Sequence, residues 1–188
     1  MPRILFFAFG LAAALGAQPV VVTLDPAGSR VEFTLGATLH TVRGTFKLKS
    51  GTIRFDPATG AAEGEVIVDA ASGVTGNGSR DGKMHREVLE SERYPDIVFA
   101  PSRVSGHLKP EGESKLQVEG TLTLHGSPKP VTLDAVVQIT GDRMTALTRL
   151  VVPYVQWGLK NPSTLFLRVS DKVDLTLHAA GRVAVQTP

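Results

Sequence analysis

The chain has 188 residues, which is enough for one domain of ordinary size with one hydrophobic core. It has no cysteine, so neither a disulfide framework nor an acylation cysteine is available to it. Its formal net charge at pH 7 is only +2, which excludes the strong basic field that gathers nucleic acid or acidic lipid headgroups.

The N-terminal segment, from Met1 to Ala17, has the three parts of a secretory signal peptide. Arg3 gives the basic start, an apolar run extends from Ile4 to Leu15, and small residues follow at Gly16 and Ala17. The run is too short to anchor the protein in a bilayer. We expect residues 1–17 to be removed, leaving a periplasmic or secreted protein without a transmembrane anchor. A buried N-terminal helix is the alternative.

Apolar and polar residues alternate through most of the remaining chain, the period expected of half-buried strands. Val31, Phe33 and Leu35 share one face of an early strand, while Glu32 and Thr34 share the other. Similar segments recur, bounded by turns rich in Gly, Pro, Asp and Asn. Eight or nine strands with short connections favour an antiparallel arrangement, because parallel neighbours need crossovers of a dozen or more residues.

An open sheet of this size would leave two edges unpaired, and closing it into a barrel removes both. The sequence therefore predicts an all-β, antiparallel barrel of about eight strands, forming a single domain over residues 18–188. Such a barrel is filled by its own side chains or holds one slender ligand. Ten apolar residues share the inward phase and are predicted to line the cavity: Phe33, Leu35, Phe46, Leu48, Ile97, Phe99, Leu122, Leu124, Leu133 and Val137.

One stretch, residues 78–99, interrupts the strands with the pattern of a short amphipathic helix. Met84, Val88 and Leu89 form a narrow apolar stripe, and Pro95 limits the helix on its C-terminal side. A helix of about three turns is not stable alone in water. We expect it to cover the open end or side of the barrel as a lid, with Met84 and Leu89 facing the cavity.

Two histidines are candidates for chemistry. His85 lies beside the apolar stripe, and His125 precedes the tight turn "HGSPKP". Each is a possible general base, but each also suits a structural hydrogen bond to nearby backbone. The sequence has no paired histidine spacing for a metal and no GxSxG or SxxK motif for a nucleophile. We predict no catalytic residue, no metal and no cofactor.

A second unusual stretch, residues 153–170, is predicted to be a long loop, and such loops in compact domains are often functional. It contains Trp157, the single tryptophan of the chain, which either gates the cavity or covers the core. Lys160 and Arg168 are candidates to meet the polar end of a ligand.

Several segments, in order along the chain, resemble the YceI-like family of exported lipid-binding proteins. They are "LDPAGSRVEF" at 24–33, "HTVRGTF" at 40–46, "GN" and "RD" within 76–81, "ERYPDIVF" at 92–99 and "VEGTLTLHGSPKPVTL" at 118–133. The resemblance spans Val22 to Ala179. It implies a lipocalin-like extended barrel with a helix packed against it. It also implies an elongated apolar cavity for polyisoprenoid chains, such as quinone tails, or related amphiphiles. Two segments depart from the family pattern: "MHREVLES" in the helix and "VPYVQWGLKNPS" in the late loop.

We therefore expect an exported binding or carrier protein that holds a long-chain isoprenoid or another lipid, with no nucleic-acid partner. Burial supplies the affinity, at about 0.8 kcal/mol per methylene. Whether the protein forms a homodimer is left open. Two alternatives also stay open: a lipid- or quinone-modifying enzyme that uses His85 or His125 as base, and a ligand-free stress or structural protein.

Overall fold

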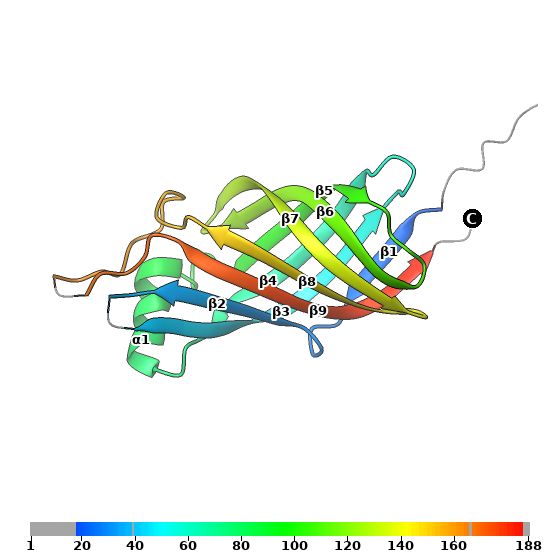
Figure 1. Ribbon diagram of the computed structural model, residues 1–188. Helices are drawn as coiled ribbons and strands as arrows, with labels where there is room; N and C mark the ends of the chain where they lie inside the picture. Colours follow the sequence, from blue (N-terminus) through cyan, green and yellow to red (C-terminus); the bar gives the residue numbers. More distant parts are fainter. Residues whose placement is uncertain (1–17, 39, 166, 186–188) are drawn as a thin grey trace, which may run out of the picture.

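The structure is a computed structural model that describes residues 18–38, 40–165 and 167–185. The predicted signal peptide lies outside the described residues. Within them the chain forms nine strands and one short helical segment (Figure 1). The elements are β1 (Val20–Leu24), β2 (Arg30–Gly36), β3 (Thr41–Phe55), β4 (Ala62–Val74), α1 (Gly78–Lys83), η1 (Met84–Leu89), β5 (Asp96–Gly106), β6 (Gly112–Leu124), β7 (Ser127–Thr140), β8 (Arg143–Val152) and β9 (Val173–Val185).

The sheet closes on itself. Its strands follow the order β3-β2-β9-β8-β7-β6-β5-β4, and β4 then pairs with β3, with every pairing antiparallel. Strands β1 and β2 share one position in this ring. Val20 of β1 lies opposite Phe55 of β3 and Val185 of β9, whereas β2 pairs with the same two strands nearer the other end. The ring thus has eight strand positions, which confirms the predicted barrel.

The alternating apolar and polar residues of the sequence point to the inner and outer faces of the barrel wall, respectively. It is clearest in β7, where Val131, Leu133, Ala135, Val137 and Ile139 face the interior and the residues between them are exposed. This strand pairs with β6 along its whole length without a shift in register. A single apolar phase therefore runs through β7, as period-two alternation predicts.

Strand β3 changes phase partway along. Its inward side chains stand at even positions near the start, as in the buried Phe46 and Leu48, and at odd positions near the end, as in the partly buried Ile53 and the buried Phe55. The pairing with β4 shifts between Leu48 and Ser50, which marks a β-bulge. One extra residue in the strand moves the apolar set back to the interior, and it also bends the long strand around the barrel.

The two ends of the barrel differ. The connections after β2, β4, β6 and β8 gather at one end, which we call the helix end because α1 and η1 lie there (Figure 1). The connections after β3, β5 and β7 gather at the opposite end, here called the turn end, where β1 starts and β9 finishes. The short helical segment packs at the barrel, as the sequence predicted.

The helical segment is shorter and wider than the expected helix. Asn77 caps α1 by accepting a hydrogen bond from the backbone N–H of Arg80, and the chain continues from α1 into one turn of π-helix. The segment ends at Leu89 rather than near Pro95, because Glu90 adopts a left-handed conformation with φ 45°. A left-handed residue turns the chain out of the helix and closes its last hydrogen bonds.

Candidate binding cavity

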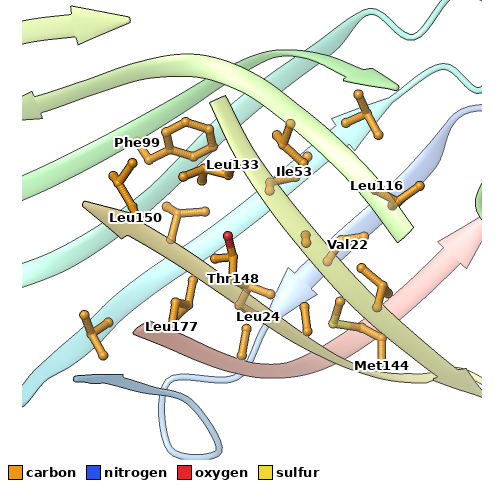
Figure 2. Close-up of a pocket in the computed structure, with 18 of the residues that line it drawn as sticks. Val22, Leu24, Ile53, Phe99, Leu116, Leu133, Met144, Thr148, Leu150 and Leu177 are labelled. Carbon is orange, nitrogen blue, oxygen red and sulfur yellow. The ribbon is translucent and has the colours of Figure 1, made fainter. Parts of the chain in front are cut away.

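The barrel encloses a cavity of about 210 Å³ (Figure 2). Within the part of the chain that the structure describes, its lining is made of apolar side chains from every strand, with Thr148 as the one polar exception. A cavity of this volume has room for many waters, but buried waters need two to four polar partners each. The lining supplies almost none, so the cavity suits hydrocarbon better than water.

Small side chains on three adjacent strands leave much of this space. Ala146 of β8 lies opposite Ala179 of β9, and Ala135 of β7 lies opposite Thr148 of β8. All four line the cavity. Larger residues at these positions would fill the interior, as they do in a barrel packed only by its own side chains. This part of the wall therefore favours a lumen that is open to a ligand.

The cavity extends toward the turn end. Leu116, Ile139 and Met144 line it near the turns, and Leu108 reaches it from the connection between β5 and β6. That connection is bounded by Gly106 and Gly112, with φ values of 106° and 86°.

Two hydrogen bonds hold the same connection in place. The backbone N–H of Lys109 donates to Ser114 Oγ over 2.9 Å, and the backbone N–H of Gly141 donates to Glu111 Oε2 over 3.1 Å. Ser114 is buried, whereas Glu111 and Gly141 are exposed. The connection is thus fastened to β6 and to the turn between β7 and β8.

The helix end is packed solid. The ring centroids of Phe33 and Phe46 are 5.1 Å apart. A Cβ atom at Gly44 would lie 2.3 Å from Phe33 Cζ, and one at Gly73 would lie 2.4 Å from Phe46 Cε1 and 2.9 Å from Met84 Cε. Glycine is thus required at both positions so that the two rings and Met84 can pack against the strands. This cluster fills the barrel between the cavity and the helix.

The thirteen residues predicted to line the cavity fall into two groups, those that line it and those that pack in the core elsewhere. Six of them do line it: Phe46, Ile97, Phe99, Leu122, Leu133 and Val137. The other seven pack in the core outside the lining: Phe33, Leu48, Leu89 and Leu124 are buried, and Leu35, Met84 and Trp157 are partly buried. The ligand-binding role of all thirteen residues stays a prediction.

The loop that carries Trp157 closes over the same end. Tyr154 is buried, and its hydroxyl donates a hydrogen bond of 2.6 Å to the backbone oxygen of Ser170. Lys160 Nζ lies 2.8 Å from Glu87 Oε2 and joins the loop to the helical segment. This hydrogen bond and ion pair lower the pKa of Glu87 below its usual value. Lys160 therefore has a partner within the protein.

The candidate histidines are both engaged in structural contacts. His85 Nε2 lies 2.8 Å from the backbone oxygen of Gly73, and its Nδ1 lies 3.1 Å from Ser91 Oγ. Because a carbonyl can only accept, Nε2 carries a proton, and in the neutral ring Nδ1 then accepts from the serine hydroxyl. His125 Nε2 contacts Glu90 Oε1, and neither histidine lines the cavity. In the described ranges no group of three or more His, Asp or Glu side chains is placed to hold a metal.

The sequence interpretation missed the part of the lining near the turn end. Val22, Leu24, Met144 and Val183 lie on the inward phase of their strands, so the same alternation could have found them. Leu108 stands in a loop, where no periodic signal exists. Across the residues that the structure describes, none of the helices is long and apolar enough to cross a membrane.

Comparison with known proteins agrees with this architecture. The pattern of the YceI-like domain matches residues 22–180. A UPF0312 protein of Vibrio parahaemolyticus is 30% identical over 138 residues, covering 69% of this chain and 71% of the relative.

Two solved structures have the same fold. One is BcnA of Burkholderia cenocepacia, with a TM-score of 0.67, 22% identity, and coverage of 86% of this chain and 99% of BcnA. The other is a polyisoprenoid binding domain from Saccharophagus degradans implicated in plant cell wall breakdown. Its TM-score is 0.68 at 19% identity, with coverage of 87% of this chain and 98% of that domain.

Proposed function

Since the chain belongs to the YceI-like family, we propose that it is an exported carrier that holds a long apolar molecule in its barrel. The ligand is a polyisoprenoid chain, a quinone tail or a related lipid. The observation that carries this proposal is the lining, in which every side chain except that of Thr148 is apolar. Each methylene that enters such a cavity contributes about 0.8 kcal/mol.

The shape of the cavity favours a slender ligand over a compact one. Along β8 the lining extends from Met144 to Leu150, and one residue rises about 3.3 Å along a strand, which gives about 20 Å of strand. With the usual strand tilt this corresponds to about 15 Å along the barrel axis. A chain can occupy this length, and selection by length and width needs few polar contacts.

The comparison supports the same class of ligand. The structure from Saccharophagus degradans, with the same fold, is described as a polyisoprenoid binding domain. The cavity of the present protein has the apolar surface that such a chain requires. These two observations together favour an isoprenoid over a flat, polar cofactor.

A binding role also fits the polar residues better than an enzymatic one. The two candidate bases, His85 and His125, pack outside the cavity lining and bond groups of the protein itself. A general base must reach the proton that it removes. Substrate held in the cavity would be separated from both histidines by the packed helix end.

Export is proposed from the segment Met1 to Ala17, which has the basic start, apolar run and small residues of a signal peptide. Expression of the full chain in a Gram-negative host, followed by fractionation and mass measurement, tests this proposal. We expect a periplasmic product that begins at Ala17 or Gln18. An unprocessed cytoplasmic product would contradict export and would have no bearing on the binding proposal.

The binding proposal is tested with a substitution that fills the cavity. Ala146→Phe places a large ring in the lumen, whereas Thr145→Phe places the same ring on the exposed face of the same strand. Delipidated protein is titrated with an apolar fluorescent probe and with a C20 isoprenoid. We expect Ala146→Phe to weaken binding at least about tenfold, the loss of two buried methylenes or more. Thr145→Phe should bind like the wild type.

Thermal unfolding shows whether each variant is folded. Wild-type affinity in a folded Ala146→Phe variant would mean that ligands bind elsewhere. As an independent measurement, mild extraction of freshly purified protein followed by mass spectrometry should release a long-chain isoprenoid or lipid.

A further inference from the structure

Among the described residues, Thr148 is the single polar side chain in the cavity lining. It stands in the middle of the inward row of β8, between Ala146 and Leu150, and Figure 2 shows it among the apolar side chains of the lumen. Its Oγ1 atom is shielded from solvent and has no hydrogen-bond partner within the described part of the chain. A hydroxyl is therefore held in an environment that offers it nothing to bond.

This arrangement does not serve the stability of the empty protein. A buried hydroxyl without a partner costs free energy, because folding removes its hydrogen bonds to water. Valine has nearly the same shape and would fill the same space without that cost. The flanking inward positions hold Ala146 and Leu150, so an apolar residue fits this row.

A trapped water is a poor partner for this hydroxyl. Buried waters typically make about three hydrogen bonds, and the lining has one polar side chain to offer. A ligand needs only one polar atom at this depth, because the rest of its surface meets hydrocarbon. Rotation about χ1 by one staggered step can move the threonine hydroxyl into the place of its methyl and the methyl into the place of Hβ, so the hydroxyl can turn toward a ligand.

We propose that Thr148 forms a hydrogen bond with a neutral polar group of the ligand, halfway along the cavity. This inference rests on the proposed function and narrows the ligand class. A hydroxyl both donates and accepts, so an alcohol, a ketone or a quinone oxygen suits it. A carboxylate or phosphate does not, because the described residues of the lining include no cation to balance a buried charge.

The space around Thr148 has room for such a group. Ala135 lies directly opposite it in β7, and Ala146 precedes it on the same face of β8. Both side chains end at Cβ, so the wall is recessed next to the hydroxyl. The structure thus assigns the polar group of the ligand to the recess formed by Ala135, Ala146 and Thr148, and the apolar chain to the rest of the cavity.

The test compares two probes that differ in one oxygen. A C20 isoprenoid alcohol and the C20 hydrocarbon of the same branching are supplied as cyclodextrin complexes, and each displaces an apolar dye from the delipidated protein. Three variants are measured beside the wild type. Thr148→Val removes the hydroxyl and keeps the shape, Thr148→Ser keeps the hydroxyl, and Thr145→Val makes the same change on the exposed face of β8.

We expect Thr148→Val to weaken the alcohol about fivefold and to change the hydrocarbon less than twofold. Thr148→Ser and Thr145→Val should keep the preference for the alcohol. The ligand-free Thr148→Val protein should unfold about 2–4 °C higher than the wild type, because the unpaired hydroxyl is gone.

Equal effects of Thr148→Val on both probes, or no effect on either, would overturn the assignment of Thr148 and leave the carrier function intact. Failure of the wild type to bind either probe would instead overturn the proposed function, and the role of Thr148 with it.

Discussion

Glu90 and His125 both adopt left-handed backbone conformations, with φ values of 45° and 53°, and their side chains meet with 3.1 Å between Oε1 and Nε2. Glu90 ends the helical segment, and His125 begins the two-residue turn between β6 and β7. The ring of Tyr94 packs on the histidine, with 4.2 Å between centroids. Non-glycine residues in this conformation persist where their surroundings hold them. The contact fastens the helical segment to a hairpin of the barrel.

His125→Ala should therefore lower the free energy of unfolding by about 1–2 kcal/mol, because it removes the hydrogen bond and the ring contact. Binding of an apolar probe should stay within a few-fold of the wild type, since His125 lies outside the cavity lining. Denaturant unfolding and probe titration measure the two effects. His40→Ala, a change at an exposed histidine, is the control. Loss of probe binding by a folded His125→Ala variant would restore the idea that a rim histidine acts on the ligand.

Gly44→Ala should destabilise the barrel by at least about 2 kcal/mol. The added Cβ would lie 2.3 Å from Phe33 Cζ and 2.5 Å from the backbone oxygen of Val74, and backbone cannot move aside cheaply. Gly36→Ala is the matched control, because its Cβ would meet only Ser170 Cβ, at 3.9 Å. That change should stay within about 0.5 kcal/mol of the wild type. Equal stability of the two variants in denaturant titrations would contradict the packing described at the helix end.

The stability of the protein should fall as the pH rises from 10 toward 12. Burial, assisted by the negative charge of Asp171, raises the pKa of Tyr154 from 10.0 to about 12. The folded state therefore keeps the phenolic proton where the unfolded state loses it, so the contribution is complete below pH 10 and lost through pH 12. Thermal midpoints measured across this range should fall more steeply for the wild type than for Tyr154→Phe. Parallel curves would mean that Tyr154 titrates like a free tyrosine.

Leu89→Asp distinguishes a fixed plug from a movable lid. Leu89 is 9% exposed and belongs to the core but not to the cavity lining. A carboxylate there should lower stability by about 3 kcal/mol. Below its unfolding temperature, the variant should still bind the apolar probe like the wild type. Arg86→Asp, which places the charge on the exposed side of the same segment, should change neither property much. Release of the probe from folded Leu89→Asp would show that the helix gates the cavity.

The barrel could be predicted because alternation reports which side of the wall a residue occupies. Alternation does not report how far along the barrel axis an inward residue lies. Phe46 and Leu48 share the inward phase and are both buried, but Phe46 borders the cavity and Leu48 packs outside its lining. Which of them meets empty space depends on the size of side chains across the lumen, and those residues are distant in sequence.

Two other features had no readable signal. The π-helical turn depends on how Met84 and Leu89 fit the barrel end, and helix periodicity in the sequence does not distinguish it from an α-helix. Thr148 lies on the same inward phase as Met144 and Ala146, but a rule that assigns apolar residues to the interior passes over it. The rule that apolar residues face the interior thus fails at Thr148, a polar residue of functional interest.

Strand β9 pairs with β1 and β2 on one side and with β8 on the other, and it follows all of them along the chain. While the ribosome is still making β9, the earlier strands can form only an open sheet with two free edges and its apolar face uncovered. Closure must wait for nearly the whole sequence, and the contacts that complete it join distant segments, which slows folding. A chain whose last strand closes the ring cannot complete its fold before synthesis of that strand has ended. The same delay exposes it to edge-to-edge aggregation, so a chaperone that shields free strand edges should raise its yield.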